Sequence, residues 1–154
     1  MIKRFVILTV ALLATTLFSA CEKDGDTQKP TINIIEPTDG TELLAGEEIH
    51  FEVEFSDNQE LKSYKVDIHS AEDGHSHTKS MSTEDHIPWA MQKSWDFEAG
   101  QKNAHIHHHE IVIPTAIDGV PIETGHYHLL IYCTDKEGNE SWKAIGIAIA
   151  MPTK

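Results

Sequence analysis

The chain has 154 residues, and its 25 acidic side chains outnumber its 12 Lys and Arg, giving a formal net charge of −13. This length provides room for one domain, and the acidic balance disfavours nucleic-acid binding, because contacts with phosphates require clustered Lys and Arg. Two cysteines, Cys21 and Cys133, do not make a disulfide framework. The 11 histidines are the most informative feature of the composition.

The N-terminus has the anatomy of a signal peptide over residues 1–20. Lys3 and Arg4 precede an apolar run, 5–18, that is too short for a comfortable membrane span, and small residues follow it before Cys21. Residues 17–21 (LFSAC) resemble the lipobox of bacterial lipoproteins, although Phe18 stands where that pattern prefers Leu. The resemblance implies cleavage before Cys21 and lipidation of its thiol, and the alternative is an ordinary secretory signal with an incidental cysteine.

The segment 21–29 is polar and charged without periodicity, which predicts a flexible tether. Its acidic residues resemble the surface-export signals of lipoproteins in the Bacteroidetes, and a solvated linker is the alternative interpretation. Lipidation at Cys21 would hold the protein on a membrane, since two or three acyl chains anchor stably.

Beyond the tether, the sequence predicts an all-β domain over 30–152. Alternating apolar and polar residues or short apolar runs between turn signals favour strands at 31–36, 48–56, 64–69, 93–97, 105–113, 125–134 and 141–149, with 93–97 as a short edge strand. Six or seven short strands without a helical period favour an immunoglobulin-like antiparallel β-sandwich. Tyr127 opens the penultimate strand like a tyrosine corner, and Cys133 shares the inward parity of that strand.

The histidines suggest a transition-metal site. A His-x-His pair on extended chain directs both imidazoles to one side, and Zn and Cu(II) favour imidazole nitrogen. In an immunoglobulin-like sandwich the third and penultimate strands are neighbours, so His69 and His128 should meet on the outward face, with the loop after His69 folding back over them. We therefore predict a site of His69, His75, His77 and His128, with Asp67, Asp73 and His126 as alternates or supporting residues. Solvated surface histidines are the alternative.

A possible second site comprises His105, His107 and His109. If Ile111 and Ile113 face the core, the three histidines share this inward parity and lie towards the opposite end of the sandwich from the first site. The alternative is that the strand directs these rings outward as solubilising residues. His50 and His86 stand alone in the sequence and are interpreted as structural or solvated.

The pattern D-I-H-x5-H-x-H, followed by G-H-Y-H-L and the closing D-K-E-G-N-E-S, resembles an uncharacterised family of Bacteroidetes lipoproteins with one immunoglobulin-like domain. The resemblance covers about residues 30–150 and implies a fold and a lipoprotein context, but no established activity. Carried over by position, its histidine motif falls on His69, His75, His77 and His128, and the run 105–109 lies outside it.

These features favour a cell-envelope lipoprotein, attached to the outer membrane and facing either side of it, that captures, buffers or transfers Zn or Cu. Its partners would be the membrane, through Cys21, and an envelope protein. The alternative is an interaction module that binds a glycan or a partner protein and has no functional metal. Enzymatic activity is not expected, because no hydrolase signature such as H-E-x-x-H is present.

Overall fold

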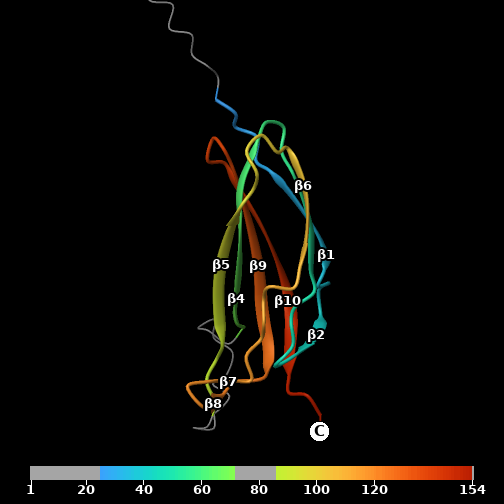
Figure 1. Cartoon of the computed structure of the whole chain (residues 1–154), viewed down its shortest axis with the longest axis vertical. Helices are drawn as coiled ribbons and strands as arrows, with labels where there is room; N and C mark the ends of the chain where they lie inside the picture. The colour runs from blue at the N-terminus through green and yellow to red at the C-terminus, as the bar shows by residue number, and fades with distance from the viewer. Residues whose placement is uncertain (1–24, 72–85, 154) are drawn as a thin grey trace, which may run out of the picture.

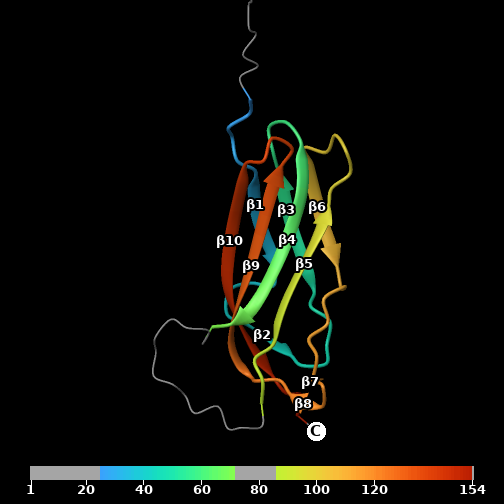
Figure 2. The ribbon, with the colours of Figure 1, turned by 90° about the vertical axis from the view of Figure 1, so that its left-hand side faces the viewer.

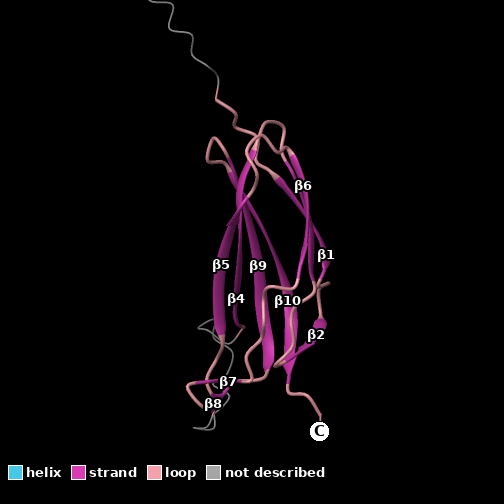
Figure 3. Ribbon diagram, in the orientation of Figure 1, coloured by secondary structure: helices cyan, strands magenta, loops and turns pink. Residues whose placement is uncertain are grey.

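The computed structural model describes residues 25–71 and 86–153, and this part of the chain is all-β (Figure 3). Its strands are β1 (Thr31–Glu36), β2 (Thr41–Leu44), β3 (Phe51–Ser56), β4 (Leu61–Ser70), β5 (Ala90–Asp96), β6 (Asn103–His108), β7 (Ala116–Ile117), β8 (Val120–Pro121), β9 (Gly125–Asp135) and β10 (Glu140–Ala150). No helix able to cross a membrane occurs within these residues.

Two sheets face each other, which confirms the predicted all-β sandwich. One sheet has three strands in the order β1-β3-β6, and the other has five in the order β2-β10-β9-β4-β5 (Figure 2). The hairpin of β7 and β8 lies at the lower end in Figure 1, where the described C-terminus also lies. The N-terminal segment leaves from the upper end.

The core follows from the two-residue period of the strands. On β3, Phe51, Val53 and Phe55 are buried while the side chains between them face solvent. The same alternation buries Tyr64, Val66 and Ile68 on β4. On β9 the alternation buries every second apolar side chain from Tyr127 to Cys133, whose thiol is free, and the sequence predicts this inward parity for Cys133.

The predicted tyrosine corner is present at the start of β9. The buried Tyr127 hydroxyl donates a hydrogen bond to the backbone carbonyl of Glu123 at 2.7 Å and accepts one from the backbone N–H of Trp89 at 3.3 Å. The side chain thereby ties the entry of β9 to the segment that leads into β5.

Several elements differ from the prediction. β2 was not predicted, because a strand of four residues shows too little alternation. β2 pairs in parallel with β10, which is distant in the chain. β5 lies at the sheet edge as predicted, but it begins at Ala90 rather than residue 93. β6 ends at His108 rather than at residue 113, and β7 with β8 forms a hairpin that carries little apolar pattern.

Candidate metal centre

The predicted meeting of His69 and His128 is present. β4 and β9 are antiparallel neighbours in the five-stranded sheet, and these two residues are direct cross-strand partners on its outer face. Their ring centroids lie 5.7 Å apart in an edge-to-face arrangement. His126 lies two positions before His128, on the same exposed face. Metal ligation by these residues stays a prediction.

Asp67 orients the His69 ring. Its Oδ1 lies 2.8 Å from His69 Nδ1, and its Oδ2 accepts a hydrogen bond from Gln92 Nε2 at 2.8 Å. Partial burial raises the pKa of Asp67, but the hydrogen bonds from His69 and Gln92 outweigh this effect, so the pKa lies below its ordinary value. A carboxylate on Nδ1 leaves Nε2 of His69 available as a ligand, which is the usual arrangement behind metal-bound histidines.

The other predicted members of this site lie outside the described residues. They are Asp73, His75 and His77, and the same holds for the predicted lipidation residue Cys21 and the signal peptide.

The second group of histidines lies on the outer face of the three-stranded sheet. β3 and β6 pair with Phe51 opposite His108, Glu52 opposite His107 and Glu54 opposite His105. Side chains of one parity on each strand therefore form two facing columns on that outer face. The β3 column is Glu52 and Glu54, with His50 just before the strand, and the β6 column is His107 and His105, with His109 just after the strand.

Three imidazoles converge at the end of these columns, and we call them the outer histidine cluster (His50, His107 and His109). One ring nitrogen from each lies within 4.8 Å of the others. His50 stacks on His107 with centroids 4.7 Å apart and meets His109 edge-on at 4.8 Å. Tetrahedral Zn with 2.0–2.1 Å bonds needs nitrogens about 3.3 Å apart, so small side-chain rotations would complete the chelate.

A carboxylate borders the outer histidine cluster. Glu52 Oε1 lies 2.8 Å from His105 Nε2, and its Oε2 lies 3.7 Å from His50 Nε2. The hydrogen bond from His105 is the main reason that the pKa of Glu52 is lowered. His105 is thus engaged by Glu52 and is not a member of the converging trio.

The inward parity predicted for His105, His107 and His109 is wrong. Ile111 and Ile113 are buried as supposed, but the three histidines are exposed. β6 ends at His108, and the irregular residues after it shift the alternation by one position. The two histidine groups lie on different sheets: His105 and His107 are on β6 of the three-stranded sheet, whereas His69 and His128 are on β4 and β9 of the five-stranded sheet.

His108 is the member of the run that faces inward. Its ring stacks on Phe51 at a centroid distance of 4.8 Å and lies 5.1 Å from Trp95. Burial is the main cause that lowers the pKa of His108. Trp95 stacks in turn on Tyr64, whereas Trp142 is exposed at the surface.

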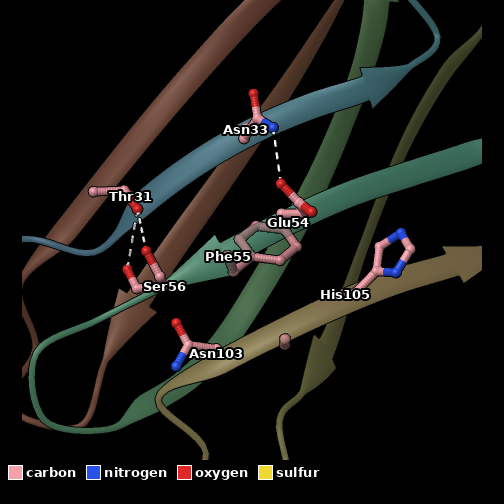
Figure 4. A pocket seen from close by; sticks show the side chains of 8 residues that line it. Thr31, Asn33, Glu54, Phe55, Ser56, Asn103 and His105 are labelled. Carbon is pink, nitrogen blue, oxygen red and sulfur yellow. Dashed lines mark hydrogen bonds between the residues drawn. The ribbon is translucent and has the colours of Figure 1, made fainter.

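A shallow hollow of about 410 Å³ adjoins the columns at their far end, over β1, β3 and β6. Figure 4 shows Asn33 and Glu54 facing each other across two strands, with His105 on the next strand. Asn33 Nδ2 donates to Glu54 Oε2 at 2.9 Å, and Thr31 bonds to Ser56. These polar groups satisfy one another, so the hollow is a weaker candidate site than the outer histidine cluster.

Sequence reasoning missed His50. The shared outward parity of His50 and Glu52 is visible in the sequence. The step that was missing is the pairing of β3 with β6, the strand that carries His107. The pairing of Phe51 with His108 brings the two residues just outside the strands, His50 and His109, close together, with their rings edge-on at 4.8 Å.

Comparison with known proteins identifies a family without a described activity. No curated protein matches the chain. The model of the family described as "Domain of unknown function (DUF4625)" matches residues 18–150, which include every described strand and both groups of histidines. The chain therefore belongs to the DUF4625 family.

Proposed function

We propose that this protein is a lipoprotein of the bacterial cell envelope that binds Zn²⁺ or Cu²⁺ and captures, buffers or transfers the ion. The observation that carries the proposal is the outer histidine cluster, in which His50, His107 and His109 present three ring nitrogens within 4.8 Å of one another. Imidazole is a preferred ligand of both ions.

The exposure of the cluster favours exchange over permanent retention. All three histidines are solvent-exposed, so a bound ion would have three protein nitrogens and one position open to water or to a partner's ligand. Structural zinc sites, in contrast, are closed by four protein ligands. The net charge of −13 and the neighbouring Glu52 would also raise the local concentration of cations.

The His69 and His128 pair supports a second site on the opposite face, in which His75 and His77 would supply the remaining nitrogens. The contact of Asp67 with His69 Nδ1, at 2.8 Å, supports this site because it leaves Nε2 of His69 free to ligate. The immunoglobulin-like topology belongs to this proposal as well, and it is supported by the adjacency of β4 and β9 and by the Tyr127 corner. The Bacteroidetes lipoprotein context rests on the sequence resemblance.

Calorimetric titration of the purified protein with Zn²⁺ tests the proposal. We expect about two equivalents to bind, with one lost in a His50→Ala/His107→Ala/His109→Ala variant and the other in a His75→Ala/His77→Ala variant. His86→Ala is the matched control, since this exposed histidine belongs to neither group. Because a ligating imidazole must be neutral, affinity should fall below about pH 6.5.

The proposal fails if neither Zn²⁺ nor Cu²⁺ binds below about 10 µM, where a chelate of several imidazoles should be occupied. It also fails if the triple variant and the His75/His77 variant both bind as the parent does. In either case the interaction module becomes the leading function. One observation already favours that second candidate: Trp142 is 61% exposed and borders a hollow formed with Pro30 and Ile32.

A further inference from the structure

Three aspartates meet at the end of the sandwich from which the N-terminal segment leaves. Asp26 belongs to that segment, Asp57 follows β3, and Asp135 ends β9. One carboxylate oxygen of each lies within 4.8 Å of the others, and we call this group the aspartate cluster. Both ribbon views place the N-terminal segment beside the loops that follow β3 and β9 (Figures 1 and 2).

Two oxygens of the cluster are buried without any hydrogen-bond partner. Asp26 Oδ2 and Asp57 Oδ2 each have less than 1 Å² of accessible surface, and neither receives a hydrogen bond. The third member, Asp135, is 0% exposed. The other oxygens of Asp26 and Asp57 accept backbone N–H groups, and Asp135 accepts hydrogen bonds from Asn139. A buried carboxylate oxygen without a partner is costly because it has lost its hydration, and like charges nearby add repulsion.

The neighbouring lysines do not neutralise this charge. Lys102 Nζ donates to the backbone carbonyl of Asn58 at 2.8 Å, and Lys136 Nζ bonds to Glu60 at 2.6 Å. Among the described residues, no Lys or Arg forms an ion pair with Asp26, Asp57 or Asp135. The two unpartnered oxygens therefore favour a positively charged ligand at this point.

We propose that the aspartate cluster binds Ca²⁺. Ca²⁺ takes six to eight oxygen ligands at about 2.3–2.6 Å and accepts irregular geometry, whereas Mg²⁺ demands a near-ideal octahedron and retains its waters. Carboxylates from three separate segments supply charge and oxygen, and backbone carbonyls with water complete the shell. The site contains no imidazole, so it is chemically distinct from the outer histidine cluster and independent of it.

Binding there would fasten the N-terminal segment to the body of the domain. The only side-chain contact that the described residues show between Asp26 and a loop is already at this point: Asn139 Nδ2 donates to the Asp26 carbonyl at 2.8 Å and to Asp135 Oδ2 at 2.6 Å. A cation shared by Asp26, Asp57 and Asp135 would join three segments that are far apart in the chain.

The experiment measures the melting temperature (Tm) and the heat of binding of the purified protein with Ca²⁺ alone. Extracellular modules bind Ca²⁺ with Kd values of about 0.1–1 mM. At about 10 mM Ca²⁺ we expect Tm to rise by roughly 10 °C over the sample in EGTA, with a smaller response to Mg²⁺. The test variant is Asp57→Asn, which keeps an oxygen for the N–H groups of Gln59 and Glu60.

Asp57→Asn should abolish the response to Ca²⁺ while raising or preserving Tm in EGTA, because it removes one of the repelling charges. Asp39→Asn is the matched control: Asp39 also accepts a backbone N–H, from Gly146 at 2.8 Å, but lies outside the cluster. It should respond to Ca²⁺ as the parent does. If Asp57→Asn fails to fold, Asp26→Asn replaces it, since Asp26 lies outside every strand.

Three results would overturn the proposal: no rise in Tm and no heat of binding for the parent at about 10 mM Ca²⁺, an undiminished response in Asp57→Asn or Asp26→Asn, or an equal loss in Asp39→Asn.

Discussion

Replacing Tyr127 with Phe isolates the contribution of the tyrosine corner to stability. The change keeps the ring, which is 1% exposed, and removes one hydroxyl that makes two hydrogen bonds with the backbone. Each bond contributes about 0.5–1.5 kcal/mol, and the buried N–H of Trp89 loses its partner. We expect the free energy of unfolding to fall by about 1–3 kcal/mol.

Urea denaturation of parent and variant measures this difference, with an unchanged m-value as the condition for comparing them. Tyr132→Phe is the control. Tyr132 lies under the Lys65 ammonium at 3.9 Å from its ring centroid, and phenylalanine keeps that contact, so the loss should stay below about 0.5 kcal/mol. A loss below about 0.5 kcal/mol for Tyr127→Phe, or equal losses for both variants, would refute the assigned role of the corner.

Three further predictions concern charge and reactivity. Because the pKa of Glu52 is lowered in the folded state, this carboxylate stabilises the fold fully above the pKa that it has in the unfolded chain, and the stabilisation is lost as pH falls through its folded-state pKa. Glu52→Gln should therefore flatten the decline of the urea midpoint below about pH 4.5. Asp67→Asn, made in the His50→Ala/His107→Ala/His109→Ala background, should weaken Zn²⁺ binding by roughly 10–100-fold in calorimetry, because the carboxylate that faces His69 Nδ1 becomes a neutral amide. Unchanged affinity would place the remaining site elsewhere. Burial, with a smaller contribution from nearby carboxylates, raises the pKa of Cys133 to about 12, so in a Cys21→Ala variant a thiol reagent at pH 8 should label Cys133 only after unfolding in urea, and rapid labelling of the native protein would contradict its burial.

Local alternation was sufficient to predict the main strands of the sandwich and the outward direction of His69 and His128. β3, β4 and β9 each bury one face and expose the other, so their two-residue period is visible in sequence, and parity then determines where His69 and His128 point. Their meeting also required the strand order of a known architecture. That step succeeded because β4 and β9 are both long and regular around these residues.

The outer histidine cluster could not be predicted from any short stretch of the sequence. The parity of His109 is set by the irregular residues between it and Ile111, where the strand has already ended. The role of His50 depends on its register against a strand more than fifty positions away in the chain. The aspartate cluster is harder still to predict, because Asp26 lies in the N-terminal segment and Asp57 in a turn, where side-chain direction follows no period, and only Asp135 belongs to a strand.

The two ends of the described chain lie at opposite ends of the sandwich, and this has a mechanical consequence (Figure 1). A force pulling these ends apart would draw β1 along β3 and β10 along β9, parallel to the strand axes. Because the hydrogen bonds of an antiparallel pair run perpendicular to its strands, such a load shears many of them together instead of opening them one by one. A domain held at its N-terminus and pulled at its C-terminus would therefore resist extension along the direction in which its sheets are strongest.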